Sequence, residues 1–195
     1  MRKILFITII ALTQFASCTS STKKQNMTAS DSIIVVFWKG CIDFSVAPSC
    51  SSMSTKAEKV ADTIIAVEKD VFMKIKKGIN GAKSFKRSWN CISKIYVKTD
   101  SAEICICDAN MVQSIHNEQV YLDLYMIYLI KWKSGYYNYI EKEFLHDFEE
   151  IRKYGIPKDY KYAYTKKTMP PYGGKPTETV ILIKKIGLRT VIHMK

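Results

Sequence analysis

The sequence KIYVKTDSAEICIC occupies residues 94–107 and decides the fold class of the chain. Its two halves, 94–98 and 102–107, are rich in β-branched residues, and in both of them apolar side chains alternate with other side chains. Between the halves lies Thr-Asp-Ser, a polar triplet of the kind found in tight turns. The pattern predicts two antiparallel strands joined by a turn, so we expect a chain that is rich in β-sheet.

Strand composition recurs toward both ends of the chain. Residues 32–38 (SIIVVFW) are almost all β-branched or aromatic, which predicts a strand. Near the C-terminus, residues 179–185 and 188–194 predict a second hairpin, and residues 160–166 alternate in the manner of a strand. The predicted sheet therefore draws strands from both ends of the domain.

The apolar stretch 120–133 admits two interpretations. It is followed by Ser134 and Gly135 and then by the aromatic run 136–140, and a two-residue break between such runs favours a long β-hairpin. A helix over 119–133 would be apolar almost all round, and it would therefore have to be buried. We expect the hairpin.

Helical spacing is clearest in residues 142–154 (KEFLHDFEEIRKY), which end in basic residues and are followed by Gly155 and Pro157. Residues 55–66 also place apolar side chains at helical spacing. The overlapping stretch 63–76 fits a hairpin equally well, so its structure stays open.

Length and composition limit the possible fold classes. The chain has 195 residues, of which 47% are hydrophobic, and this apolar content is too high for global disorder. One short apolar run stands out, residues 4–12, and the body of the chain shows no membrane-spanning segment. We expect one α+β domain over residues 33–195, a single sheet-rich domain of antiparallel hairpins with one or two helices.

The N-terminus has the pattern of a secretory signal peptide. Arg2 and Lys3 precede the apolar run 4–12, and small residues follow before Cys18. Nine apolar residues span roughly 14 Å as a helix, less than half the thickness of a bilayer core. The sequence therefore predicts an exported chain whose signal peptide is residues 1–17.

The sequence Ala16-Ser17-Cys18 resembles the lipobox of bacterial lipoproteins, with Phe15 standing where that family most often has Leu. The resemblance covers residues 1–18 only. It implies that Cys18 is lipidated on its sulfur, becomes the first residue of the mature chain and holds the protein on a bacterial membrane, at the periplasmic face or the outer surface. Residues 18–32 would then be the lipidated cysteine and a flexible tether. An ordinary signal peptide with a chance cysteine is the alternative.

Five cysteines remain if Cys18 carries lipid, and an oxidising compartment favours disulfides among them: Cys41, Cys50, Cys91, Cys105 and Cys107. An odd number allows at most two bridges, in any of 15 arrangements that the sequence does not distinguish. Cys105 and Cys107 share one face of a predicted strand, where bonding to each other is awkward and bonding to different partners is easy. A bridge from Cys41 to Cys50 would close a short loop.

The sequence gives little indication of catalysis or metal binding. The sequence contains no G-x-S-x-G, H-E-x-x-H, Walker A or EF-hand pattern, so we assign no catalytic residue, no metal ligand and no cofactor. Cys105, Cys107 and His116 would supply three ligands of a zinc site, but the usual C-x-x-C spacing is missing. The alternative function is a small periplasmic hydrolase or thiol-redox protein that uses these same residues.

The tyrosines are the most informative polar side chains, because ten of the twelve lie between Tyr121 and Tyr164. Such a cluster forms either a recognition surface or cross-strand packing. The candidate binding face consists of six residues: Tyr121, Tyr125, Trp132, Tyr136, Tyr137 and Tyr139.

Net charge suggests the kind of partner. The chain has a formal net charge of +12, and the 178 residues after the signal peptide carry +10, from 28 basic and 18 acidic residues. An exported protein rarely meets nucleic acid, so we expect an acidic partner in the envelope: anionic lipid headgroups, acidic glycans or an acidic protein. The expected function is a non-enzymatic envelope lipoprotein that binds a protein partner, in the manner of an immunity or inhibitor protein.

Overall fold

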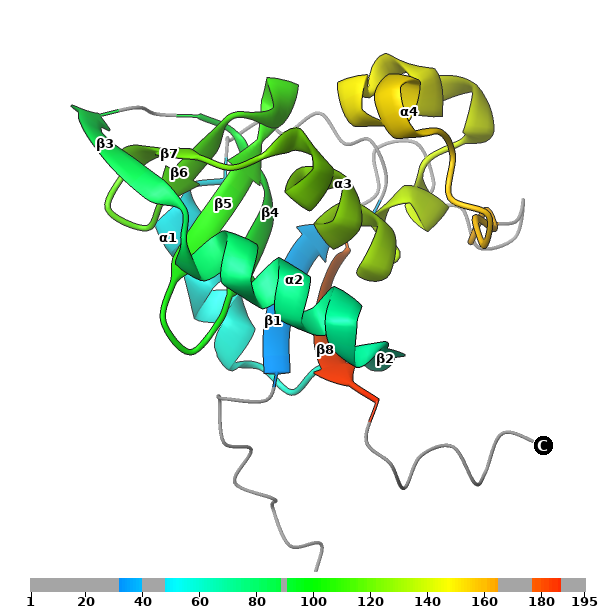
Figure 1. Cartoon of the computed structure of the whole chain (residues 1–195), viewed down its shortest axis with the longest axis horizontal. Coiled ribbons are helices and arrows are strands. Elements are labelled where there is room, and N and C mark those ends of the chain that lie inside the picture. The colour runs from blue at the N-terminus through cyan, green and yellow to red at the C-terminus, as the bar shows by residue number, and fades with distance from the viewer. Residues whose placement is uncertain (1–31, 40–47, 89–90, 165–176, 187–195) are drawn as a thin grey trace, which may run out of the picture.

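The computed structural model describes residues 32–39, 48–88, 91–164 and 177–186, which form one eight-stranded mixed sheet with helices on both faces (Figure 1). This confirms the expected α+β class. The strands follow one another across the sheet in the order β2-β8-β1-β4-β5-β6-β7-β3. Their bounds are β1 (Ser32–Trp38), β2 (Thr63–Val67), β3 (Lys83–Ser88), β4 (Ser93–Lys98), β5 (Glu103–Cys107), β6 (Val112–Ser114), β7 (Glu118–Tyr121) and β8 (Glu178–Lys185).

The helices in the described residues are short. Four of those described are α-helical: α1 (Cys50–Ser54), α2 (Lys69–Asn80), α3 (Leu124–Lys133) and α4 (Glu149–Tyr154). Four are single 3-10 segments: η2 (Thr55–Glu58), η3 (Asp108–Asn110), η4 (Tyr136–Tyr139) and η5 (Lys142–Asp147). None of the helices in the described part of the chain has the length and apolar content needed to cross a membrane.

The centre of the sheet follows the sequence prediction. β4 and β5 form the expected antiparallel hairpin, in which Tyr96 pairs with Cys105 and Val97 with Ile104. The predicted first strand is β1, which lies between β4 and β8 and is antiparallel to both. β8 matches the strand predicted at 179–185, but its partners are β1, to which it is antiparallel, and β2, to which it is parallel. The proposed second arm of its hairpin, residues 188–194, lies outside the described residues.

Two apolar layers cover the two faces of the sheet. On one face, Phe72, Ile75 and Ile79 of α2 pack with residues of α3 and with the inward side chains of the central strands. On the other face, Met53 of α1 packs against Tyr96 and its neighbours. Figure 1 shows α2 crossing in front of the strands and α1 behind them. A Cβ on Gly78 of α2 would stand 2.7 Å from Met126 Sδ, so this glycine allows α2 and α3 to approach closely.

The long hairpin expected over 120–140 is wrong. Residues 124–133 form α3, the six consecutive residues 126–131 are buried, and Asp123 caps the helix by accepting a hydrogen bond from the Tyr125 N–H at 2.8 Å. The Ser-Gly pair ends this helix, because Gly135 adopts a left-handed conformation with φ of +75°. A continuous apolar run does not distinguish a buried strand from a buried helix, and here the all-round burial selects the helix.

Three further predictions need correction. Instead of a helix over 55–66, the chain turns through η2 and enters β2, which settles the open stretch 63–76 as a strand followed by α2. The helix predicted at 142–154 is divided into η5 and α4 by Phe148, whose backbone is extended. Residues 160–164 form no strand, and the rest of that predicted segment lies outside the described residues.

Candidate functional site

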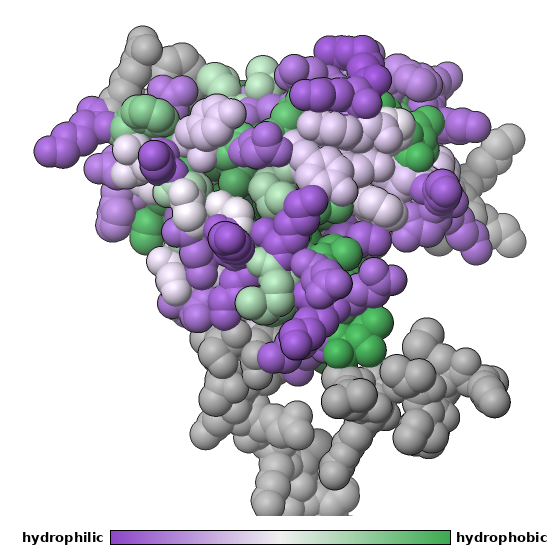
Figure 2. Space-filling model, in the orientation of Figure 1, coloured by the Kyte–Doolittle hydropathy of each residue, from purple (hydrophilic) through white to green (hydrophobic). Residues whose placement is uncertain are grey.

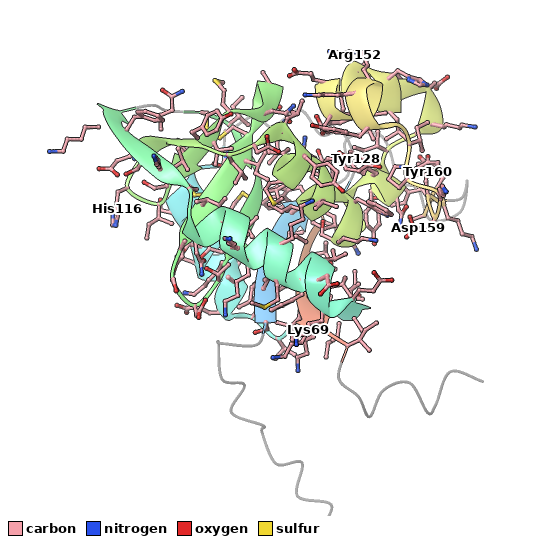
Figure 3. All side chains as sticks on the ribbon, in the orientation of Figure 1. Lys69, His116, Tyr128, Arg152, Asp159 and Tyr160 are labelled. Atoms are coloured by element: carbon pink, nitrogen blue, oxygen red, sulfur yellow. A yellow bond between two sulfur atoms is a disulfide. The ribbon has the colours of Figure 1, made fainter. Side chains whose placement is uncertain are left out.

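A cluster of aromatic rings lies where α3 meets α4. Tyr125, Tyr128 and Trp132 stand at positions i, i+3 and i+7 of α3, which places them on one side of that helix, and Tyr154 at the end of α4 packs against them. We call these four residues the aromatic face. In Figure 2 the pale side chains gathered near the junction of these two helices lie in this region, and Figure 3 labels Tyr128 there.

Ring contacts hold the aromatic face together. Tyr128 is the buried centre, with ring centroids 6.1 Å from Tyr125, 5.6 Å from Trp132 and 5.4 Å from Tyr154. The three surrounding rings are half-buried, so each keeps part of its surface in solvent. Burial and the neighbouring Tyr125 and Asp159 raise the pKa of the Tyr128 hydroxyl, which therefore stays protonated.

Lysine side chains surround the rings. Lys74 Nζ lies 4.3 Å from the centroid of Tyr125, and Lys133 Nζ lies 3.5 Å from that of Trp132. Lys153 Nζ lies 5.4 Å from the ring of Tyr154. These lysines come from α2, α3 and α4, and together they form a basic rim around the aromatic face.

Asp159 is the acidic neighbour of the rim. Its Oδ1 accepts a hydrogen bond from Trp132 Nε1 at 2.5 Å, which fixes the orientation of the indole ring. Figure 3 places Asp159 and Tyr160 on the same side of the molecule as Tyr128. The aromatic face therefore presents oriented rings, with lysines beside them.

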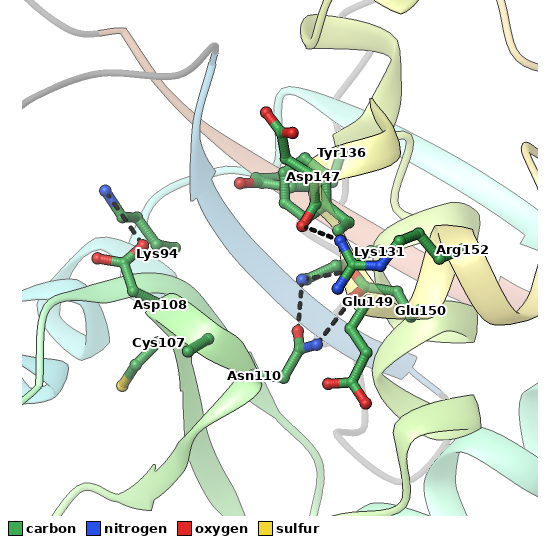
Figure 4. Close-up of a pocket in the computed structure, with 12 residues that line it drawn as sticks. Lys94, Cys107, Asp108, Asn110, Lys131, Tyr136, Asp147, Glu149, Glu150 and Arg152 are labelled. Atoms are coloured by element: carbon green, nitrogen blue, oxygen red, sulfur yellow. Dashed lines mark hydrogen bonds and ion pairs between the residues drawn. The ribbon is translucent and has the colours of Figure 1, made fainter. Parts of the chain in front are cut away.

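A buried ion pair holds α3 and α4 together behind this surface (Figure 4). Glu150 of α4 is fully buried, and its Oε1 accepts hydrogen bonds from Lys131 Nζ at 2.6 Å and from the Tyr137 hydroxyl at 2.9 Å. Asn110 joins the pair, since its Nδ2 donates to Glu150 Oε2 at 2.8 Å and its Oδ1 accepts from Lys131 Nζ at 2.9 Å. Both carboxylate oxygens therefore have partners, which offsets the cost of burying the charge.

The lowered pKa of Glu150 indicates that its carboxylate is charged in this network. Burial alone would raise the pKa of Glu150, but the Lys131 ammonium and the hydrogen bonds from Lys131 and Asn110 outweigh it and lower the pKa below its ordinary value. Burial lowers the pKa of Lys131, and the attraction of Glu150 opposes that shift. Burial and the Glu150 charge both raise the pKa of the Tyr137 hydroxyl, so Tyr137 acts as a hydrogen-bond donor.

A pocket of about 310 Å³ opens beside this network and is lined by residues of η3, α3 and α4. Ala109 and Asn110 both have left-handed backbones there, with φ of 53° and 58°. A left-handed conformation is unfavourable for alanine, and the Asn110 contacts to Lys131 and Glu150 help to hold the turn. The pocket thus marks the place where the loop after β5 is tied to α3 and α4.

The candidate binding face from the sequence is divided by the structure. Tyr125 and Trp132 do lie together on the aromatic face, but Tyr136 and Tyr137 are buried in the core. The ring centroid of Tyr139 lies 5.8 Å from that of Phe37 in β1. Tyr121 is 67% exposed on β7, away from α4. Tyr128 and Tyr154 belong to the aromatic face and were not in the predicted set; the helical spacing of 125, 128 and 132 was the signal for Tyr128.

Four cysteines form two disulfides, Cys50–Cys105 and Cys91–Cys107, with Cα–Cα distances of 5.7 and 5.9 Å. The expectation that Cys105 and Cys107 bond to different partners is confirmed. The bridge considered between Cys41 and Cys50 is wrong, because Cys50 pairs with Cys105. Cys18 and Cys41 lie outside the described residues.

The disulfides argue against the zinc site and the reactive thiol considered for Cys105 and Cys107. Cys105 and Cys107 are both oxidised, so in this state neither is a nucleophilic thiolate or a zinc ligand. His116 lies in the turn between β6 and β7 (Figure 3), where its backbone N–H donates to Ser114 Oγ at 3.2 Å. No cluster of three or more histidine, cysteine or acidic side chains suited to a metal ion occurs within the described ranges.

Comparisons with protein-family models, with curated proteins and with solved structures each return no match for this chain. The functional conclusion therefore depends on the sequence and on the surfaces described above.

Proposed function

We propose that the chain is an exported, lipid-anchored protein of a bacterial envelope that binds a protein partner through the aromatic face. The signal-peptide pattern and the lipobox-like Cys18 support the proposed location in the envelope. The two disulfides also support it, because such bonds persist in oxidising compartments and are rare in the cytosol.

The observation that carries the binding function is the composition of the aromatic face. Tyrosine and tryptophan are enriched at protein interfaces, since their rings supply large contact areas at low entropic cost. Tyr125, Trp132 and Tyr154 are held by Tyr128 beneath them, so little ordering is needed when a partner binds. The aromatic face is therefore preorganised for binding.

Charge selects the partner. The basic rim formed by Lys74, Lys133 and Lys153 favours a partner whose contact surface is acidic, through faster association and through rejection of basic surfaces. An immunity or inhibitor role, in which the tethered domain captures an incoming acidic protein at the membrane, is the form of this function that the size and the tether favour.

The test is variant-dependent capture of a partner. The full chain is purified with its bound proteins from the envelope of the cells that make it, as wild type, as Lys74→Glu with Lys133→Glu, and as Tyr125→Ser with Trp132→Ser. Val60→Ser is the matched control, because Val60 is an apolar side chain that is 92% exposed outside the aromatic face.

We expect one acidic protein to accompany the wild type and the control and to be lost from both aromatic-face variants. The charge variant alters the exposed Lys74 and the half-buried Lys133 and leaves all the rings in place, so it reports on binding even if the ring variant folds poorly. Equal recovery of the same proteins by all four chains would refute the proposed face.

A further inference from the structure

The edge of the sheet formed by β3 has an open side. β3 is the last strand in the sheet order, and among the described residues it pairs with β7 alone. Its residues Lys83, Ser84, Phe85 and Lys86 are all exposed. No other segment within the described ranges pairs with its outer edge, so a row of backbone N–H and C=O groups faces outward there. In Figure 1 β3 lies at the opposite end of the molecule from α4.

Two large apolar side chains stand next to this edge. Phe85 is 53% exposed and Tyr121 is 67% exposed. In the β3–β7 register Lys83 lies opposite Tyr121 and Phe85 lies opposite Gln119, so the two rings share one face of the sheet at diagonal positions. That face is the one opposite Val120, which points into the core. The edge therefore offers apolar contacts as well as backbone groups.

Charge at this edge is positive. Between residues 71 and 99 the sequence contains eight basic and no acidic residues. Lys83 and Lys86 form no ion pair with a described residue. The acidic residue of β7, Glu118, lies opposite Ser88, at the other end of the strand from Lys83. A segment that pairs with the start of β3 would thus meet uncompensated lysines.

Edge lysines also have a protective role, because they discourage strands from pairing by accident. That role accounts for Lys83 and Lys86, but it does not account for two exposed rings beside them. The same lysines disfavour pairing of β3 with β3 of a second copy, since like charges would be brought together. The charge pattern is complementary to an extended segment that carries carboxylates.

We propose that β3 is a docking edge for an extended acidic polypeptide segment, which adds to the sheet as a further strand beside β3. Backbone hydrogen bonds give the affinity, carboxylates of the segment meet Lys83 and Lys86, and apolar side chains of the segment contact Phe85 and Tyr121. This surface is separate from the aromatic face, and the inference does not require the proposed function.

The probe is a fluorescent ten-residue peptide of alternating Glu and Val, titrated into the purified full chain and followed by fluorescence anisotropy and by amide hydrogen exchange. We expect saturable binding that weakens with added salt, together with slower exchange of amides in 83–88. Lys83→Glu with Lys86→Glu is expected to weaken binding about tenfold or more, because like charges then face each other. The matched control, Lys158→Glu with Lys161→Glu, changes two exposed lysines near α4 and is expected to leave binding unchanged.

Any of the following outcomes would overturn the proposal: equal binding of a Lys-Val peptide, protection of β2 instead of β3, or a dimer that forms through β3 and excludes the peptide. Circular dichroism checks the fold of each variant, and Lys83→Gln with Lys86→Gln replaces the glutamate pair if that pair unfolds. Full binding by a folded form of either pair would also overturn it.

Discussion

Glu150 and Lys131 are charged residues in a place where charges are costly. Their side chains are 0% and 5% exposed, and they are compensated by each other, by Asn110 and by Tyr137. A pair of this kind contributes little net stability compared with apolar residues of similar size, but removing one member leaves the other charge buried without a partner. The pair links α3 to α4 through a contact in which each buried charge depends on the other.

We predict that Lys131→Met lowers the free energy of unfolding by about 3–5 kcal/mol, the usual cost of breaking a buried ion pair. Urea unfolding followed by circular dichroism measures the change. The double variant Lys131→Met with Glu150→Leu is expected to regain most of the loss, because no charge then remains buried. A loss below about 1 kcal/mol in the single variant would mean that the two side chains are solvated in solution.

Acid is predicted to destabilise the fold through the same carboxylate. The folded-state pKa of Glu150 is lowered from its ordinary value of 4.5, so folding favours the ionised form. This contribution is fully present above about pH 4.5 and is lost as the pH falls through the folded-state pKa. The pKa of Glu103 is lowered too: burial alone would raise it, but hydrogen bonds from Lys98 and Tyr96 outweigh burial.

Urea midpoints between pH 6 and pH 3 test this prediction. We expect a steady fall below about pH 4.5 in the wild type and a shallower fall in the Lys131→Met with Glu150→Leu variant, which lacks the buried carboxylate. Parallel curves for the two chains would show that Glu150 does not contribute to acid unfolding.

The sequence shows both Lys131 and Glu150, but it does not predict that their side chains are in contact. Glu150 lies in a predicted helix among Lys142, Arg152 and Lys153, where local salt bridges are the simplest expectation. Its partner Lys131 is 19 residues away and was placed on a strand. The contact depends on the packing of two helices, and residue spacing within one segment carries no information about that packing.

At the scale of elements, prediction succeeded for the strands at the centre of the sheet. β1, the β4–β5 hairpin and β8 alternate or run in β-branched residues, and the structure has them at those places. It failed for α3, where an apolar run without periodicity concealed a buried helix, and where the cap at Asp123 was not used as a start signal. The aromatic face could not be predicted without that helix, because only helical spacing brings residues 125, 128 and 132 to one side.

The disulfides join elements that are distant in the sequence, and we predict unequal effects on stability. Cys50–Cys105 closes a separation of 55 residues and ties α1 to β5, while Cys91–Cys107 closes 16 residues. The loop-entropy relation gives about 4 kcal/mol for the first and about 3 kcal/mol for the second.

Cys→Ser pairs at each bridge, compared by urea unfolding under non-reducing conditions, measure these contributions. Because the second bridge also anchors the loop that presents Asn110 to Lys131, its removal is expected to reduce protection of α3 amides from exchange. A first bridge whose loss costs no stability would argue against oxidation of Cys50 and Cys105 in the folded protein.

At the scale of the whole molecule, the proposed lipid anchor on Cys18 would hold the domain at a membrane. We predict that Cys18→Ala leaves the exported chain in the soluble fraction, whereas the wild type sediments with membranes and carries the mass of attached acyl chains. Fractionation followed by mass spectrometry of the intact protein checks both points. Membrane association that does not change in the Cys18→Ala chain would refute the lipobox interpretation.

We propose that the aromatic face binds an acidic protein in the envelope. The most direct measurement places a photo-activated crosslinking amino acid at position 132, at position 154, or at the control position 60, in the full chain within the cells that make it. The account predicts that one acidic protein is crosslinked from 132 and from 154 and not from 60, and that Lys74→Glu with Lys133→Glu reduces its yield. Crosslinks of equal yield at all three positions, or none at 132 and 154, would contradict it.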